Sequence, residues 1–373
     1  MKILLVNWLD RANPQGGGAE IHVFELFSRL AAWGHSVRMV CSGWKGGPAR
    51  AVVDGIDVTR VSTRYGFALR GRGAVRRALA EEAPDILVED INKVPLFTAG
   101  LTDRPMCAIV PHLFGGTAFN EAPWPMAAAV WLAERPLATA YRRAGFHAIS
   151  ESTRDDLVAR GVRPECIRVI HPGVDAGRFR PDPGVRRAAP PAFLYIGRLR
   201  RYKGVDIAIR AFARALAQRP DIRFDVAGSG DTRAELERLV AELGIGHAVT
   251  FHGFVTEAQK LDLLRSTTAN IFPSPKEGWG ITVVEAAACG TPSLASDSPG
   301  LQDSVRHGET GYLVPHGDET ALAARMLELA GDPALVARLG VAARTFAETL
   351  TWDQAARETE RHLQDIINGS ACG

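Results

Sequence analysis

Two glutamates, Glu277 and Glu285, stand in the segment Pro273-Ser-Pro-Lys-Glu-Gly-Trp-Gly-Ile-Thr-Val-Val-Glu. The pattern predicts that a buried strand ends at Phe272 and that a helix begins near Ile281. The amino-terminal end of a helix offers free N–H groups and the positive end of a dipole, which together hold phosphate. A carboxylate accepts two hydrogen bonds from a vicinal diol. The segment therefore indicates a site for a ligand that carries both hydroxyl and phosphate groups.

A pair of carboxylates is also what glycoside hydrolases use. A retaining hydrolase needs its two carboxyl groups about 5 Å apart, whereas eight helical residues span about 12 Å. Because part of the stretch between Glu277 and Glu285 is loop, this spacing weakens the hydrolase interpretation and leaves it open.

A second polar turn, Gly197-Arg-Leu-Arg-Arg-Tyr-Lys-Gly204, follows an apolar run that ends at Ile196. The guanidinium fork of Arg198 and the point charge of Lys203 together suit a diphosphate. Two further arginines lie in the same turn, so a solvated basic turn is the alternative interpretation.

Three other turns carry weaker signals. Three consecutive glycines, including Gly17 and Gly18, open a predicted helix, and they fit either a phosphate-binding helix end or a flexible loop. Gly228 follows a predicted strand and fits a ribose or phosphate contact or a tight turn. His112 follows the strand that ends at Val110, where it serves either as a donor and acceptor near neutral pH or as a structural residue.

Short apolar runs alternate with helix-length segments through both halves, which predicts the α/β class with parallel sheets buried on both faces. The predicted strands are 3–6, 37–40, 86–88, 108–110, 148–149, 169–170, 193–196, 224–226, 249–251, 270–272 and 293–295. The predicted helices are 19–33, 153–160, 205–217, 233–243, 258–264, 281–289, 319–330, 333–348 and 352–367.

The proline-rich segment 172–191 stops either neighbouring element from continuing and predicts an interdomain linker. We therefore expect an N-terminal Rossmann-like domain at 1–171, a C-terminal one at 192–350, and a final helical segment at 351–373. Two such domains imply a cleft faced by the carboxyl ends of their strands.

Composition excludes several classes of protein. The chain has 373 residues, of which 46% are apolar and 23% charged, with a net charge of +2, so neither disorder nor nucleic-acid binding is expected. Five scattered cysteines without a C-x-x-C pair fit a reducing cytosol better than a disulfide framework or a zinc site. The longest uncharged apolar stretch, 126–133, is too short for a bilayer, so a cytoplasmic protein is expected. The sequence contains no D-x-D motif, so it offers no acidic pair for binding a metal ion.

The chain resembles the retaining glycosyltransferases of family 4, which have the two-domain GT-B fold. The motifs that carry the resemblance are Glu-Gly-Trp-Gly with its Glu277-to-Glu285 spacing, Ala-Cys-Gly-Thr-Pro, and Gly-Arg-Leu before Lys203. The triple glycine, His112 and the segment 150–157 support it in the first half. Trp279 departs from the phenylalanine or other hydrophobe usual in the family, which leaves the shape of the sugar pocket open.

The resemblance implies roles for individual residues. Glu277 would hold hydroxyls of the donor sugar, and Glu285 would hold the donor ribose. Arg198 and Lys203 would clamp the diphosphate, and His112 would sit beside the sugar at the reaction centre. The other residues implied in donor binding are Gly17, Gly18, Gly228, Gly253, Phe254, Gly278, Trp279, Gly280 and Ile281. The last helix would pack back on the first domain.

The activity implied is transfer of a hexose from a UDP- or GDP-linked sugar to a hydroxyl acceptor, with retention and without metal or cofactor. The acceptor would be a saccharide, a lipid-linked molecule or a small molecule, in cell-envelope polysaccharide or glycolipid synthesis. Two alternatives remain: a sugar-nucleotide 2-epimerase of the same fold, and a non-catalytic sugar-nucleotide-binding subunit. The sequence gives neither the donor, the acceptor nor the oligomeric state.

Residues 64–80 hold five arginines and no acid, with apolar side chains between them. This pattern fits a basic amphipathic segment that rests on anionic lipid at the inner face of a membrane. A solvated helix face or a site for an anionic acceptor fits slightly better, because three glycines in the stretch weaken a helix.

Overall fold

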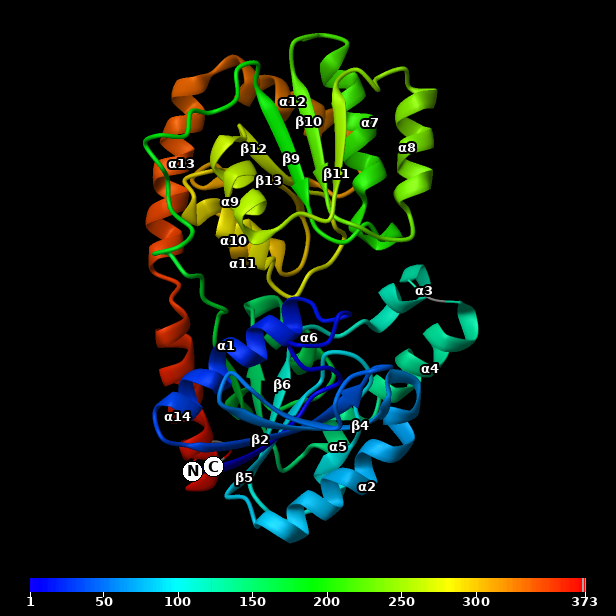
Figure 1. The fold of residues 1–373 in the computed structure, drawn as a ribbon, viewed down its shortest axis with the longest axis vertical. Coiled ribbons are helices and arrows are strands. Elements are labelled where there is room, and N and C mark those ends of the chain that lie inside the picture. The colour runs from blue at the N-terminus through cyan, green and yellow to red at the C-terminus, as the bar shows by residue number, and fades with distance from the viewer. Residues whose placement is uncertain (122, 371, 373) are drawn as a thin grey trace. The chain divides into compact units, whose positions relative to one another are not determined.

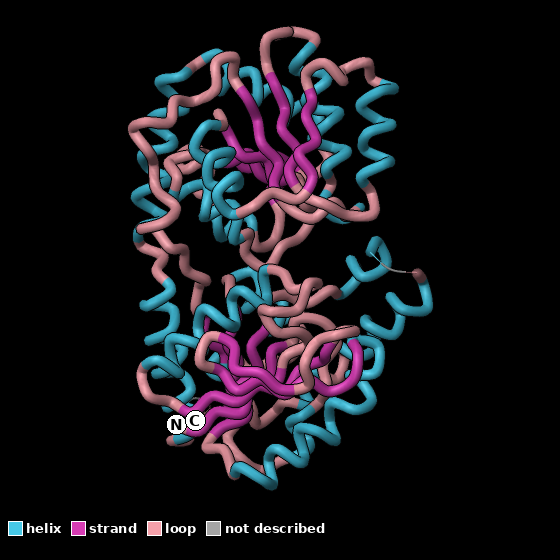
Figure 2. The backbone as a smooth tube through the Cα atoms, viewed as in Figure 1, coloured by secondary structure: helices cyan, strands magenta, loops and turns pink. Residues whose placement is uncertain are grey.

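The computed structural model describes residues 1–121, 123–370 and 372. The chain forms two compact units, Met1–Pro172 with Trp352–Gly373, and Gly173–Thr351 (Figure 1). Each unit contains its own sheet (Figure 2). Most of the segment that was expected to be a linker, 173–191, belongs to the second unit.

The first unit is built on an eight-stranded sheet with the order β3-β4-β2-β1-β5-β6-β7-β8. Its strands are β1 (Lys2–Val6), β2 (Ser36–Gly43), β3 (Arg50–Val53), β4 (Ile56–Thr63), β5 (Ile86–Asp90), β6 (Met106–Val110), β7 (Gly145–Ala148) and β8 (Ile167–Val169). Successive residues of β1 enter different cores, Leu4 and Val6 on one face and Ile3 and Leu5 on the other. The sheet is therefore buried on both faces, as parallel sheets require.

Helices of the first unit cover both faces of this sheet. They are α1 (Gly18–Ala32), α2 (Arg64–Glu82), α3 (Ala118–Glu121), α4 (Trp124–Glu134), α5 (Leu137–Ala140), α6 (Glu151–Ala159) and α14 (Trp352–Ile367). Trp352 and Leu363 of α14 share one core cluster with Phe24 and Phe27 of α1. The last helix of the chain thus completes the core of the first unit.

One edge of this sheet was not predicted. Strands β3 and β4 form an antiparallel hairpin in which Val53 pairs with Ile56, so the expectation of a wholly parallel sheet is wrong at this edge. Both turn residues have positive φ, 49° at Asp54 and 80° at Gly55, as a two-residue hairpin turn requires. The Asp-Gly pair between apolar residues was the available signal for this hairpin.

Residues 64–82 form one continuous helix, α2, despite their glycines. Phe67, Val75 and Leu79 bury one face of the helix in the core of the first unit. Gly71 packs against the Phe67 ring, where a Cβ atom would lie 3.1 Å from the ring. Tertiary packing therefore outweighs the low helix propensity of glycine here.

The second unit has a six-stranded sheet in the order β11-β10-β9-β12-β13-β14, and every pairing in it is parallel. Its strands are β9 (Ala192–Ile196), β10 (Arg223–Ala227), β11 (Val249–Gly253), β12 (Ala269–Phe272), β13 (Ser293–Asp297) and β14 (Gly311–Pro315). Its helices are α7 (Val205–Leu216), α8 (Arg233–Glu242), α9 (Glu257–Ser266), α10 (Ile281–Ala288), α11 (Leu301–Ser304), α12 (Glu319–Gly331) and α13 (Pro333–Glu348).

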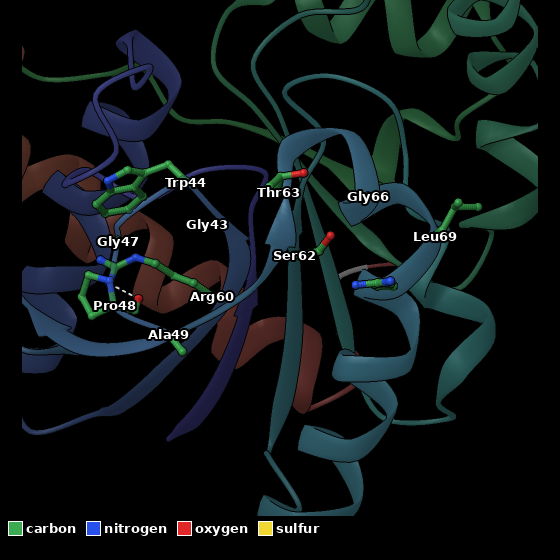
Figure 3. A pocket seen from close by; sticks show the side chains of 11 residues that line it. Gly43, Trp44, Gly47, Pro48, Ala49, Arg60, Ser62, Thr63, Gly66 and Leu69 are labelled. Atoms are coloured by element: carbon green, nitrogen blue, oxygen red, sulfur yellow. Dashed lines mark hydrogen bonds between the residues drawn. The ribbon is translucent and has the colours of Figure 1, made fainter.

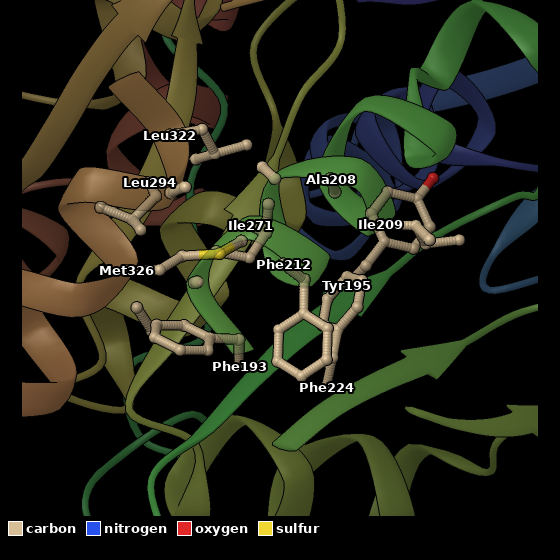
Figure 4. Close-up of a cluster of buried hydrophobic side chains, with 14 of the residues drawn as sticks. Phe193, Tyr195, Ala208, Ile209, Phe212, Phe224, Ile271, Leu294, Leu322 and Met326 are labelled. Atoms are coloured by element: carbon tan, nitrogen blue, oxygen red, sulfur yellow. The ribbon is translucent and has the colours of Figure 1, made fainter. Parts of the chain in front are cut away.

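In the core of the second unit, helices pack against the central strands of the sheet. Phe212 of α7 lies against Phe224 of β10 with ring centroids 5.4 Å apart, and Met326 of α12 is fully buried in the same cluster (Figure 4). Strands β9 and β12 are parallel neighbours at the centre of the sheet. The segments that follow these two strands therefore leave from the same edge, which brings the two polar turns of the sequence together.

Within the described residues, no helix combines the length and the apolar character that crossing a bilayer would take.

Candidate donor site

Each of the two glutamates of the predicted site pairs with a lysine. Lys203 Nζ lies 2.5 Å from Glu277 Oε1, and both side chains are 13% exposed. Lys260 Nζ lies 2.6 Å from Glu285 Oε2, and the Glu285 side chain is 9% exposed. The second unit thus holds two largely buried carboxylate–ammonium pairs, one between the turns after β9 and β12 and the other between α9 and α10.

Gly204 allows Lys203 to reach Glu277. Its φ is 66°, and a Cβ atom at this position would lie 2.7 Å from the Pro273 carbonyl oxygen. A residue with a side chain would hold the turn after β9 away from the segment after β12. Gly204 is the last residue of the turn 197–204, called the cationic turn below. Because it lacks a side chain, it allows the contact between Lys203 and Glu277.

Helix α10 begins directly after this contact. Gly280, with φ 93°, is its N-cap, and no side chain caps this end. Trp279, the residue before this N-cap, is 2% exposed. The first N–H groups of α10 therefore follow Glu277 by three to four residues. These free N–H groups and the positive end of the helix dipole favour binding of an anionic group.

A neighbouring loop braces the Glu277 turn. The Glu277 N–H donates to the Pro299 carbonyl at 3.0 Å, and the Ser298 hydroxyl donates to the Ser274 carbonyl at 2.9 Å. A Cβ atom at Gly300 would lie 2.1 Å from the Glu277 carbonyl oxygen. The sequence analysis did not single out this loop after β13, although its Ser-Pro-Gly sequence signalled a turn.

We expect Gly300→Ala to lower the melting temperature and weaken nucleotide binding, because the new Cβ would push the Glu277 turn away. Gly308→Ala is the matched control, since Gly308 has a similar φ of 77° and nothing within 4 Å of its would-be Cβ. Both variants share the cost of a positive φ, on the order of 1 kcal/mol. Thermal melts and UDP titrations of both check the prediction, and equal effects would contradict it.

Burial and charge act in opposite directions on these groups. Burial, the largest single effect, lowers the pKa of Lys203, but Glu277 and Tyr202 together outweigh it and the pKa of Lys203 is raised. Burial raises the pKa of Glu285, and the Lys260 ammonium opposes part of that rise. Lys203 is thus a fixed cation at neutral pH, whereas the charge on Glu285 depends on Lys260.

The other predicted residues of the second unit surround the cationic turn. A Cβ atom at Gly228 would lie 1.8 Å from the Gly197 carbonyl oxygen, and the Gly228 N–H donates to the Gly253 carbonyl at 2.7 Å. Arg198 is exposed, and its carbonyl accepts the Tyr195 hydroxyl at 2.9 Å. Phe254 is 83% exposed. The turns after β9, β10 and β11 therefore pack together and leave a cation and an aromatic ring accessible.

Gly17, Gly18 and His112 belong to the first unit. Gly17 is the N-cap of α1, and its N–H donates to Glu20 Oε2 at 2.7 Å. This amide is therefore bonded to the capping carboxylate in the structure, and its role in phosphate binding stays a prediction. Gly18 is the first residue of α1. The His112 ring packs edge-on against Phe114 with centroids 4.8 Å apart.

Lys260 is the residue that sequence reasoning missed. It lies on α9, and its ammonium lies 5.1 Å from the centre of the Phe179 ring as well as beside Glu285. One lysine on a polar helix gives no signal in the sequence, because its pairing depends on how α9 packs beside α10.

In the portion of the chain that the structure describes, no three His, Cys, Asp or Glu side chains gather where they could hold a metal ion. The cations at this site are lysine and arginine side chains.

Comparison with known proteins identifies the family. The model of "Glycosyltransferase Family 4" matches residues 16–178, and that of "Glycosyl transferases group 1" matches residues 181–346. The chain belongs to glycosyltransferase family 4. The two matches cover most of both units and leave out β1 and α14 of the first unit.

Curated relatives of this family 4 glycosyltransferase include D-inositol 3-phosphate glycosyltransferases. The protein from Streptomyces bingchenggensis is 35% identical over 238 residues, 59% of this chain and 52% of the relative. The protein from Streptomyces avermitilis is 39% identical over 212 residues, 52% of this chain and 45% of the relative. The chain matches about half the length of these relatives.

Solved structures similar to this glycosyltransferase show its fold. Sucrose-phosphate synthase from Thermosynechococcus elongatus matches with a TM-score of 0.83 and 24% identity, over 99% of this chain and 100% of that one. Anabaena Alr3699/HepE in complex with UDP-glucose matches with a TM-score of 0.78 and 20% identity, over 98% of this chain and 100% of that one. The predicted GT-B fold, with two Rossmann-like α/β domains, is thereby confirmed.

Proposed function

We propose that this family 4 glycosyltransferase transfers a hexose from a nucleotide-diphosphate sugar to a hydroxyl acceptor with retention, without a metal ion or other cofactor. The observation that carries the proposal is the contact between Lys203 and Glu277 beside the amino-terminal end of α10. In a sugar nucleotide, the sugar hydroxyls and the diphosphate are joined through one anomeric carbon. The Glu277 carboxylate can bind the sugar hydroxyls while the adjacent Lys203 ammonium binds the diphosphate, so the contact matches that arrangement.

Charge supports the assignment of the diphosphate to this edge. Lys203 has three N–H donors, and its one contact with Glu277 leaves donors for phosphate oxygens. Arg198 is exposed on the same turn, and α10 adds its dipole. Together these groups would stabilise the charge that grows on the departing diphosphate. Stabilisation of charge in the transition state is usually the largest single contribution to an enzyme's rate enhancement.

The proposed step breaks the bond between the anomeric carbon and the diphosphate oxygen. The acceptor oxygen bonds to the same face of that carbon, and its proton passes to the departing phosphate oxygen. Glu277 would orient the sugar through its hydroxyls, and Glu285 would bind the ribose. His112 would lie beside the sugar.

A panel of sugar nucleotides tests this function. Purified protein is incubated with each UDP- and GDP-linked hexose, with and without EDTA and a mixed set of acceptors, and products are followed by NMR. We expect acceptor-dependent release of nucleoside diphosphate, unchanged by EDTA, and an α-linked product from an α-linked donor. Release of a free epimer without acceptor would favour the epimerase alternative, and binding without turnover would favour a non-catalytic subunit.

For the acceptor, the names of the curated relatives favour an inositol phosphate as the first candidate to test. Saccharide and lipid-linked acceptors of cell-envelope synthesis form the remaining arms of the panel.

Contact with a membrane through 64–80 stays a prediction. Along α2, Tyr65 is 91% exposed, Leu69 is 86% exposed, and Arg76 and Arg77 are exposed. Arg72 instead donates to the Leu96 carbonyl at 2.7 Å. We expect anionic vesicles to sediment the protein at low salt and the double variant Arg76→Gln/Arg77→Gln to weaken this binding. Absence of the wild-type protein from the vesicle pellet would end this idea.

A further inference from the structure

The segment that was expected to be a linker begins with a tight turn, residues 175–179, called the linker turn below. A carboxylate oxygen of Asp175 accepts the N–H groups of Gly177 at 3.1 Å and of Arg178 at 3.0 Å. The Asp175 carbonyl accepts the Phe179 N–H at 2.8 Å. Aspartate favours such turns because its side chain bonds to the backbone two residues on. The linker turn ends on Phe179, whose side chain is 5% exposed.

The Phe179 ring contacts a cation of the donor site. Lys260 Nζ lies 5.1 Å from the centre of this ring and 2.6 Å from Glu285 Oε2. A cation within about 6 Å of an aromatic centre is attracted to the ring, more strongly where water is excluded. The Lys260 side chain is 15% exposed. The ammonium group therefore has two partners, an aromatic ring on the linker turn and a carboxylate on α10.

The linker turn is also tied to α10 itself. Arg344 of α13 donates to the Phe179 carbonyl at 2.7 Å and to the Ala288 carbonyl at 2.7 Å. It donates as well to the Ala176 carbonyl at 3.1 Å. Ala288 is the last residue of α10, the helix that carries Glu285. One guanidinium group thus connects the backbone of the linker turn to the helix of the carboxylate.

The first unit contains a contact of the same kind. Arg60 Cζ lies 4.7 Å from the centre of the Trp44 ring, and Arg60 makes two bonds to the buried Asp10 carboxylate, at 2.7 and 3.0 Å (Figure 3). The planar fork of an arginine fixes its own orientation, whereas a lysine carries a point charge on a flexible stem. Lys260 therefore depends more on its aromatic partner than Arg60 does.

Several charges act on Glu285. Burial raises its pKa most, and the Lys260 ammonium is the largest effect in the opposite direction. Glu257 of α9 raises the pKa further, and Arg178 of the linker turn lowers it. Burial raises the pKa of Cys289, the residue after α10, to about 12, so this thiol is neutral near pH 7. The position of the Lys260 ammonium therefore decides how readily Glu285 ionises.

We propose that Phe179 is a positioning residue of the donor site, whose ring holds the Lys260 ammonium against Glu285. The linker turn is then part of the ribose site. The inference rests on the proposed transferase function, in which Glu285 binds the ribose of the donor. It adds the linker turn to the groups that set the affinity for that donor.

The pKa of Glu285, measured in the full chain without nucleotide, tests the proposal. Carbon-13 NMR of glutamate-labelled protein follows the carboxyl group, and Glu285→Gln identifies its signal. Phe179→Leu keeps an apolar side chain and removes the ring, so we expect the pKa of Glu285 to rise by about half a unit. Phe179→Tyr keeps a ring and should keep the wild-type pKa. Melting curves show that the variants are folded.

Two further variants separate positioning from a general loss of packing. Phe346 of α13 is 8% exposed and has its own cation, with Arg306 Cζ 4.5 Å from its ring. Phe346→Leu should therefore leave the pKa of Glu285 unchanged. In a Lys260→Met background, Phe179→Leu should add no further shift, because its effect passes through Lys260. An unchanged pKa in folded Phe179→Leu, an equal shift in Phe346→Leu, or additive shifts in the double variant would overturn the proposal.

Titrations of the same samples with UDP and GDP separate this inference from the function. Below the pKa of Glu285, we expect Phe179→Leu to bind the nucleotide about threefold more weakly than the wild type, the ratio that half a pKa unit gives. If a nucleotide binds and the pKa does not move, the role of Phe179 is wrong and the transferase proposal stands. If the pKa moves and neither nucleotide binds, the donor site is wrong, and the link between the linker turn and the donor fails with it.

Discussion

Replacing Lys203 by alanine should lower kcat/KM for transfer by about 100-fold, the range found when a group that stabilises charge in the transition state is removed. The variant loses the cation assigned to the diphosphate, and Glu277 loses its partner at 2.5 Å. The loss should appear mainly in kcat if Lys203 acts on the charge that develops as the diphosphate departs. Initial rates with a donor found active in the panel give both constants.

Arg201→Ala provides the matched control for this variant. Arg201 lies in the same turn, but its side chain is 80% exposed and pairs with Glu235 at 3.7 Å. We expect kcat/KM of this variant within about twofold of the wild-type value, because an exposed pair is worth little. A melting curve for each variant shows whether the unpaired Glu277 has disturbed the fold. A folded Lys203→Ala protein with wild-type kcat/KM would remove Lys203 from the site.

The second large effect concerns pH. Lys260→Met removes the cation that opposes the burial of Glu285, so the pKa of Glu285 should rise further. If ribose binding needs the ionised carboxylate, the acid limb of the profile of kcat/KM against pH should move upward by about one unit. The rate at high pH should change less than the rate at low pH, because the carboxylate is ionised there in both proteins.

Two further variants show whether Glu285 is the group that titrates. Glu285→Gln should lower kcat/KM and abolish the shifted limb, since an amide does not titrate. Arg238→Met removes an exposed cation from α8 of the same unit and should leave the limb in place. An acid limb that stays at its wild-type pH in Lys260→Met would contradict the role given to the Lys260–Glu285 pair.

The sequence predicted most of the central strands because each is a short apolar run buried on both faces, as at Ile3–Val6 and Phe193–Ile196. It also predicted that the turns at Lys203 and Glu277 share one site, since parallel strands end at one edge of a sheet. It did not predict the pairing of Lys260 with Glu285, because that contact depends on how α9 packs beside α10.

The sequence also contained signals for the β3–β4 hairpin and for the arginine-rich stretch 64–80, but the first was not used and the second did not decide between interpretations. The Asp54-Gly55 turn of the β3–β4 hairpin is visible in the sequence and was not used. The arginine-rich stretch 64–80 fitted three interpretations, and only the structure separates Arg72, which bonds to backbone carbonyls, from Arg70, which lines a cavity at the start of α2. Side chains of one type on one helix have different roles because they face different surroundings.

The place of α14 in the core of the first unit has a consequence for synthesis on the ribosome. The second unit is one uninterrupted stretch, Gly173–Thr351, and can complete its core as soon as it has emerged. The first unit emerges earlier but lacks Trp352 and Leu363 until the last helix has been made. At elongation rates of about 5 to 20 residues per second that delay is roughly 10 to 40 s. The nascent chain therefore exposes one apolar face of its first sheet through that interval, which gives chaperones a defined surface to protect.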